Sequence, residues 1–314
     1  MAGEERVSKF YRKNGRPWLA RYPGWIASAR SAGRLCAIFV VGALLLGVAV
    51  GSAARTTGPD QTSDIVIPAP SLGGTLRATV VLPPGYGTSG KRYPVVYFLH
   101  GLPAAPFAYR GVGFLRNAFR SIGGDAILVA PQGARDGDGD GEYLNWGQGR
   151  NWETAIAGDL PRYVDAHYRT LANRRGRAIV GLSAGGYGAV LLALHHLGDF
   201  GVIESWSGYF HPTDPSGKHP LDLGSTAANA RASAHALVGS LRADERRRPT
   251  FLAFYVGNGD RRFRAENEQF DAELRSAKIP HVFRVYAGGH ESAVWSAHAG
   301  DWLGLALQHL RPAA

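Results

Sequence analysis

From Thr75 onward, short apolar runs alternate with longer stretches of helical character. Short apolar runs bounded by turn residues are typical of buried strands. The predicted strands are Thr75 to Leu82, Val95 to Leu99, Ala126 to Ala130, Ala178 to Gly181, Val202 to Trp206, Thr250 to Val256 and His281 to Tyr286. The predicted helices lie near 153–168, 186–197, 227–241, 265–277 and 294–310. This alternation predicts an α/β fold with a mostly parallel sheet and helices on both of its faces.

The N-terminal region carries a different pattern. Leu35 to Ala54 is an uncharged run of twenty residues between Arg34 and Arg55. As a helix it would be about 30 Å long, which is enough to cross a bilayer core. The basic leader over residues 1–34 predicts that the N-terminus stays in the cytoplasm and that the rest of the chain lies outside it. The run is either the core of a cleaved signal peptide or a retained membrane anchor, and the sequence leaves both open.

The following residues, 55–63, are polar and rich in turn formers, which predicts a linker. The predicted folded domain then covers residues 64–314. Cys36 is the one cysteine, so no internal disulfide can form.

The net charge of +10 is unevenly distributed. Residues 1–34 hold eight Lys or Arg against two Glu, which leaves +4 for the other 280 residues. No basic stripe interleaved with aromatic residues is visible there, so charge gives no support to nucleic-acid binding.

The segment V-G-L-S-A-G-G (Val180 to Gly186) joins a predicted strand to a predicted helix. A G-x-S-x-G turn needs its glycines because the backbone is strained and the helix packs close to the strand. Such a turn holds Ser183 out at the carboxyl end of the sheet, as a nucleophile requires. The amide of Ala184 would then lie at the helix N-terminus, where negative charge is favoured.

A serine nucleophile needs a base and an orienting acid, in the chain order serine, acid, histidine for this arrangement. Asp260 follows one predicted strand in G-N-G-D, and His290 follows the next in G-G-H. Asp260 and His290 would then lie at the same edge of the sheet as Ser183, so we predict that the three residues form a catalytic triad. Rivals to Asp260 are Glu266, Glu268 and Asp271, all of which fall on the following predicted helix.

Acyl transfer also needs two N–H donors for the oxyanion. We predict the amides of Ala184 and of Leu102, since Pro103 has no N–H to offer. Aromatic residues that could line an acyl or aryl pocket, or simply pack under loops, are Tyr109, Trp146, Trp152, Trp206 and Tyr209.

Two segments interrupt the alternation of strands and helices. The Gly and Asp loop from Arg135 to Gly149 resembles the start of a calcium loop, but Gly147 stands where a bidentate Glu is required. A solvated loop is the simpler reading, and metal binding stays an alternative. The insertion from Tyr209 to Arg248 is longer than a crossover helix needs, which is typical of a cap or a substrate wall.

Several ordered motifs together resemble a known family. They are L-P-P-G-Y at 82–86, R-Y-P-V-V-Y-F-L-H-G at 92–101, N-W-E-T at 151–154, and the three site motifs above. The chain resembles the esterase family of α/β-hydrolases that includes S-formylglutathione hydrolase, feruloyl esterases and the secreted mycolyltransferases of actinobacteria. The resemblance implies an α/β-hydrolase fold, a Ser183, Asp260 and His290 triad, and oxyanion donors at Leu102 and Ala184. His100 departs from the aspartate that the mycolyltransferase branch has there.

The expected function is therefore an extracytoplasmic serine ester hydrolase or acyltransferase. Its expected partners are a small-molecule or lipid ester, an alcohol acceptor in the case of transfer, and a membrane if residues 35–54 are retained. This chemistry requires no metal or organic cofactor. A non-catalytic binding protein of the cell envelope is the alternative, because a fold alone does not prove activity.

Overall fold

The computed structural model describes residues 61–102, 105–135, 138, 141–214 and 219–314. These residues form one eight-stranded sheet in the order β1-β2-β4-β3-β5-β6-β7-β8. The strands are β1 Thr62–Ala69, β2 Gly74–Val81, β3 Val95–Leu99, β4 Ile127–Pro131, β5 Arg177–Leu182, β6 Val202–Trp206, β7 Phe251–Gly257 and β8 Val282–Tyr286. β1 pairs antiparallel with β2, and β2 pairs antiparallel with β4. All remaining pairs are parallel, which confirms the expected mostly parallel sheet.

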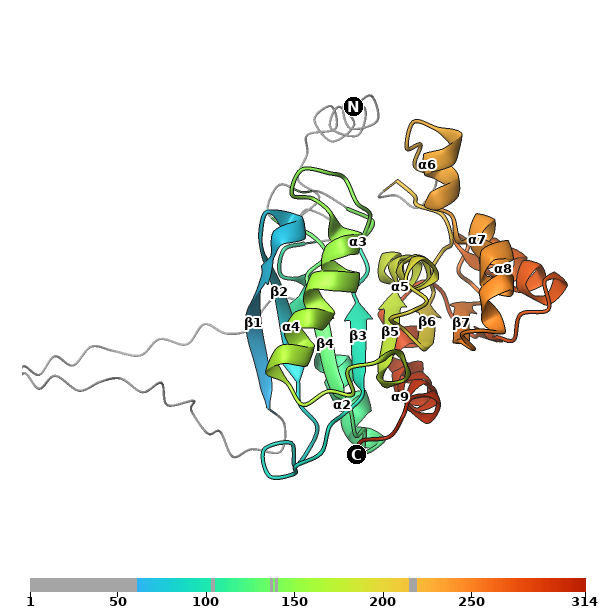
Figure 1. The fold of residues 1–314 in the computed structure, drawn as a ribbon. Coiled ribbons are helices and arrows are strands. Elements are labelled where there is room, and N and C mark those ends of the chain that lie inside the picture. Colours follow the sequence, from blue (N-terminus) through green and yellow to red (C-terminus); the bar gives the residue numbers. More distant parts are fainter. Residues whose placement is uncertain (1–60, 103–104, 136–137, 139–140, 215–218) are drawn as a thin grey trace, which may run out of the picture.

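Helices cover both faces of the sheet (Figure 1). The helices longer than three residues are α2 Gly113–Ser121, η4 Ala155–Asp159, α4 Leu160–His167, α5 Ala184–His195, α6 Thr226–Arg231, α7 Ala234–Glu245, α8 Arg264–Ser276 and α9 Ser292–His309. Short helical turns are η2 Pro70–Leu72, η3 Ala108–Arg110, α3 Trp152–Thr154 and η5 Arg174–Gly176. One hydrophobic core cluster takes residues from α4, α5, α7 and α8, and another takes residues from α2 and α9. The central strands are buried on both faces, and so they read as continuous apolar runs.

The structure differs from the sequence-based prediction in four places. β1 was not predicted, and it includes Thr62 and Ser63 of the expected linker. α2 was also not predicted. The expected helix over 227–241 is two helices, α6 and α7, with a break at Ala232 and Ser233. The expected helix near 153–168 contains a π-helical turn, η4.

The expected N-terminal hydrophobic helix at residues 35–54 lies outside the described residues. Within the described part of the chain, no helix combines the length and the apolar character needed to span a bilayer.

Candidate active site

Ser183 lies at the turn between β5 and α5, with φ 55° and ψ −120°. A non-glycine residue at positive φ is strained by about 1–3 kcal/mol and persists only where its surroundings enforce it. Here the N–H of Ser183 donates to Trp206 O at 2.9 Å, which ties the turn to β6. The backbone of Ser183 is therefore fixed by β5, which it follows, and by its hydrogen bond to β6.

The glycines around Ser183 are required by close backbone packing. A Cβ on Gly181 would lie 1.9 Å from Gly185 O, and a Cβ on Gly185 would lie 2.0 Å from Leu99 O. A Cβ on Gly186 would lie 2.6 Å from Ser205 Oγ. These clashes explain why the sequence places glycine two residues before the serine and two and three residues after it.

Two hydrogen bonds join the three residues of the predicted triad. His290 Nε2 lies 2.9 Å from Ser183 Oγ, and His290 Nδ1 lies 2.7 Å from Asp260 Oδ2. A carboxylate can only accept, so Nδ1 carries the proton and Nε2 is free to accept from the serine hydroxyl. This is the tautomer that a general base needs. The rivals to Asp260 lie elsewhere, since Glu266 contacts His211, Glu268 contacts Arg264, and Asp271 contacts Arg275 and His281.

The loops after β7 and β8 are bonded to each other, which brings Asp260 and His290 together. Gly259 N–H donates to Gly288 O at 2.7 Å, and Asn258 N–H donates to Tyr286 O at 2.7 Å. A Cβ on Gly257 would lie 2.5 Å from Gly288 O, so this approach also depends on glycine. Gly288 itself has φ 117°.

Two aromatic side chains flank the His290 ring. The rings of Phe263 and Trp295 each lie 5.1 Å from it, both in edge orientations. Trp295 Nε1 donates to Ser207 Oγ at 3.1 Å, and Ser207 stands at φ 49° just after β6. These contacts restrict rotation of the imidazole. Neither Phe263 nor Ser207 was predicted as a site residue, because neither stands in a recognisable motif.

Asp260 is buried, with a residue exposure of 2%. Burial by itself would raise its pKa, but the hydrogen bond and charge of His290 lower it, and so do the N–H groups of Arg262 and Phe263. The net effect is a pKa below the ordinary value. Asp260 is therefore ionised at neutral pH and can stabilise a positive charge on His290.

His100 holds the loop that carries Leu102. Its Nδ1–H donates to Gly101 O at 2.9 Å, and its Nε2 accepts from Gly133 N–H at 3.0 Å. Burial lowers the pKa of His100, opposed by the bond to Gly101, so the ring is neutral. A Cβ on Gly101 would lie 2.9 Å from Ser183 Cβ, which brings this loop directly against the nucleophile turn. Ala184, at the first position of α5, has an N–H with no partner within the helix.

Of the five candidate pocket aromatics, Trp146 is partly buried, and the other four are almost fully buried: Tyr109 1%, Trp152 0%, Trp206 0% and Tyr209 1%. Each of these four could touch a substrate only after a movement. Tyr209 is linked to the triad through Phe263, because its ring is 4.8 Å from the Phe263 ring, which contacts His290. Trp206 packs within the core against Phe98, at 5.6 Å between ring centroids.

Glu142 is a buried carboxylate that was not predicted as a site residue from the sequence. Tyr209 OH donates to its two carboxylate oxygens at 2.8 and 2.7 Å, and Glu142 is 2% exposed. It stands at φ 45° within the Gly and Asp loop from Arg135 to Gly149. Within that loop, Asp138 contacts Arg135 and Arg150, while Asp136 and Asp140 lie outside the described residues.

A family model described as "Putative esterase" matches residues 69–299. "Esterase Rv1288" of Mycobacterium tuberculosis is 30% identical over 251 residues, which cover 70% of this chain and 53% of that protein. The "Diacylglycerol acyltransferase/mycolyltransferase Ag85A" of Mycobacterium leprae is 24% identical over 281 residues, covering 78% of this chain and 80% of the relative.

The fold also matches solved structures. A ferulic acid esterase superposes with a TM-score of 0.65 at 25% identity, over 81% of this chain and 100% of that one. This chain spans about half the length of the first esterase relative. Because the family model covers most of the chain, from the end of β1 into α9, the chain belongs to the esterase family that this model describes.

Proposed function

We propose that the protein is a serine ester hydrolase or acyltransferase that works through an acyl-enzyme on Ser183. The observation that carries the proposal is the continuous chain of hydrogen bonds from Ser183 Oγ through His290 to Asp260, at 2.9 and 2.7 Å. The strained backbone of Ser183 supports it, since such strain concentrates at functional sites. The family and its esterase and acyltransferase relatives point the same way.

In the first half-reaction, Ser183 Oγ attacks the acyl carbon of the ester while His290 Nε2 takes the hydroxyl proton. The negative oxygen of the tetrahedral intermediate accepts hydrogen bonds from the amides of Ala184 and Leu102. When the C–O bond breaks, His290 returns its proton to the leaving alkoxide. The products are the free alcohol and the acyl group esterified to Ser183.

In the second half-reaction, His290 deprotonates either water or an alcohol, which attacks the acyl-enzyme. The bond between the acyl carbon and Ser183 Oγ then breaks, and His290 returns the proton to Ser183 Oγ. Water gives a carboxylic acid, and an alcohol gives a new ester. The relative with diacylglycerol acyltransferase and mycolyltransferase in its name supports transfer, and the esterase relative supports hydrolysis. If the protein is a mycolyltransferase-like enzyme, its expected substrates include esters of large lipid acyl groups.

The proposed location is outside the cytoplasm, either as a secreted protein or on the outer face of the membrane. Its support is the basic leader followed by the apolar run from Leu35 to Ala54. We propose no nucleic-acid partner for this protein.

The test is turnover of p-nitrophenyl esters of increasing chain length by the purified full-length protein, with and without an added alcohol. Wild type is expected to release p-nitrophenol, and Ser183→Ala is expected to lose nearly all of this activity. A new ester in the presence of alcohol would identify transfer. A folded wild type that turns over none of the esters, or a Ser183→Ala variant with wild-type rates, would contradict the proposal.

A further inference from the structure

A second cluster of polar side chains lies where the insertion between β6 and β7 packs on α8. His211 follows β6, His235 lies on α7 and Glu266 lies on α8. One side-chain nitrogen or oxygen from each of the three comes within 4.8 Å of the others, and the described residues form no other such group of three. Two imidazoles and one carboxylate make a ligand set suited to a divalent transition-metal ion.

Glu266 Oε1 is the centre of this cluster. It accepts the N–H of Phe210 at 2.7 Å, lies 2.6 Å from His211 Nδ1, and lies 3.4 Å from His235 Nε2. The carboxylate side chain is 13% exposed and that of His235 is 17% exposed. The cluster is therefore largely shielded from water, and His211, at 32%, is its most exposed member.

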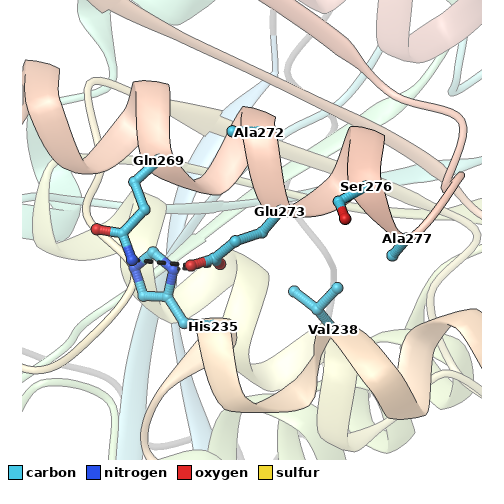
Figure 2. A pocket seen from close by; sticks show the side chains of 7 residues that line it. All are labelled: His235, Val238, Gln269, Ala272, Glu273, Ser276 and Ala277. Atoms are coloured by element: carbon cyan, nitrogen blue, oxygen red, sulfur yellow. Dashed lines mark hydrogen bonds and ion pairs between the residues drawn. The ribbon is translucent and has the colours of Figure 1, made fainter.

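Glu273 sets the orientation of His235. Its Oε2 lies 2.6 Å from His235 Nδ1, on the side that faces a surface groove of about 500 Å³ between α7 and α8 (Figure 2). The Nδ1 proton is thus committed to Glu273, and His235 Nε2 faces Glu266 Oε1, where a divalent ion would take the place of a proton between the two atoms. A carboxylate that accepts the far N–H of a ligating histidine is a common outer partner of metal sites.

We propose that His211 Nδ1, His235 Nε2 and the Glu266 carboxylate bind a divalent ion of the zinc class, with Glu273 as the positioning residue for His235. In a tetrahedral zinc site with bonds of about 2.0–2.1 Å, ligand atoms lie about 3.3 Å apart. The 3.4 Å between His235 Nε2 and Glu266 Oε1 matches this spacing, and the 2.6 Å between His211 Nδ1 and Glu266 Oε1 would have to lengthen by about 0.7 Å. Binding displaces the Nδ1 proton of His211, and water completes the coordination on the exposed side.

The site connects the insertion to the helix that follows the predicted catalytic acid. α8 begins at Arg264, four residues after Asp260, and Phe263 just before it contacts His290. An ion here would fix His211 and α7 against α8. Its expected role is structural, and its presence does not depend on the ester chemistry proposed above.

The chain offers a matched control. Glu153 Oε1 also lies between two imidazoles, 3.0 Å from His195 Nδ1 and 3.1 Å from His196 Nε2. There the other nitrogen of His195 lies 2.9 Å from Arg231 O, and the three residues do not converge as a ligand group. His196→Gln therefore removes an imidazole from a similar cluster that is not expected to bind metal.

The experiment is zinc titration of the full-length protein after removal of metal with a chelator, followed by calorimetry and by the midpoint of thermal unfolding. Wild type and His196→Gln are expected to bind one Zn²⁺, and wild type is expected to unfold about 5–10 °C higher at one hundred times Kd. Glu273→Gln is expected to weaken binding by about 10–100-fold. His211→Asn, at a partly exposed position, is expected to keep its fold and to lose the site.

Co²⁺ added to wild type supplies a second readout that needs no variant. Intense visible absorption of four-coordinate Co²⁺, absent in His211→Asn, supports the site. The proposal is overturned if wild type binds no Zn²⁺, if His211→Asn binds Zn²⁺ as tightly as wild type, if His196→Gln loses the site, or if cobalt keeps the weak absorption of its hydrated ion.

Discussion

His290 and Asp260 are 30 residues apart in the chain, and the imidazole Nδ1 lies 2.7 Å from the carboxylate Oδ2. The same Asp260 carboxylate accepts the N–H of Arg262 at 3.1 Å and of Phe263 at 3.2 Å through its other oxygen. N–H groups of its own loop therefore hold the Asp260 carboxylate in place. The carboxylate in turn orients His290, which lies on the next loop.

Asp260→Asn is expected to lower kcat by about 10³–10⁴-fold. An asparagine amide can donate to His290 Nδ1, which reverses the tautomer and leaves a proton on Nε2 where the serine hydroxyl must donate. The measurement is p-nitrophenyl ester turnover with the fold checked by circular dichroism. Glu268→Gln, which changes an exposed carboxylate of α8, is the control and should stay within about twofold. Equal losses in the two variants would contradict the role of Asp260.

Gly185→Ala is expected to destabilise the fold by about 1–3 kcal/mol or more, because its Cβ would meet the backbone of Leu99 at 2.0 Å. Gly239→Ala is the matched control on α7, where an added Cβ meets no atom within 4 Å. The control should gain up to about 1 kcal/mol from helix propensity. Urea unfolding of both variants measures the difference, and a Gly185→Ala variant as stable as Gly239→Ala would refute the packing argument.

The meeting of Ser183, Asp260 and His290 could be predicted because each of them follows a mainly apolar strand. Parallel neighbouring strands bring such residues to one edge, so the order of motifs was sufficient. β1 was not predicted because most of its residues are exposed and its sequence, T-S-D-I-V-I-P-A, is only partly apolar. The break between α6 and α7 carries no Gly or Pro, so no local signal marks it.

Contacts between distant segments could not be predicted from local patterns. Tyr209 and Glu142 are 67 residues apart and lie in different loops. His211, His235 and Glu266 come from three separate elements, and only the packing of the insertion on α8 brings them together. His100 lies in a recognisable motif, but the hydrogen bond that its Nε2 accepts from Gly133 N–H depends on the position of the loop after β4.

Glu153→Gln is expected to lose stability relative to wild type at pH 5, and this difference should vanish as the pH falls towards 2. Burial would raise the pKa of Glu153, but hydrogen bonds from His195 and His196 lower it to about 2. The depressed pKa contributes stability that is complete above the unfolded value of 4.5 and is lost as the folded carboxylate protonates. With solvent screening, the contribution is about 1–2 kcal/mol.

Chemical unfolding of wild type and Glu153→Gln between pH 2 and 6 measures this effect. A difference that does not change over that range would contradict the assigned pKa and leave only a packing effect.

Glu204→Gln is expected to gain stability over wild type as the pH rises above about 5. Glu204 is 0% exposed, and burial raises its pKa well above 4.5, opposed by a hydrogen bond from Trp206 Nε1. Above pH 4.5 the unfolded chain releases this proton while the folded protein keeps it, so wild type is progressively destabilised. The variant lacks this titration, and its amide oxygen can still accept from Trp206.

Unfolding free energies of both proteins at pH 4.5 and pH 8 test the sign. A variant that loses stability relative to wild type on going to pH 8 would show that Glu204 is ionised in the folded protein.

The central claim is that Ser183 becomes acylated with His290 as its base. The most direct measurement is intact mass and peptide mapping of the full-length protein after reaction with a fluorophosphonate. One adduct per chain is expected, located on Ser183, absent in Ser183→Ala and formed much more slowly in His290→Ala. A folded wild type that takes no adduct, or takes it on another residue with Ser183 unmodified, would contradict it.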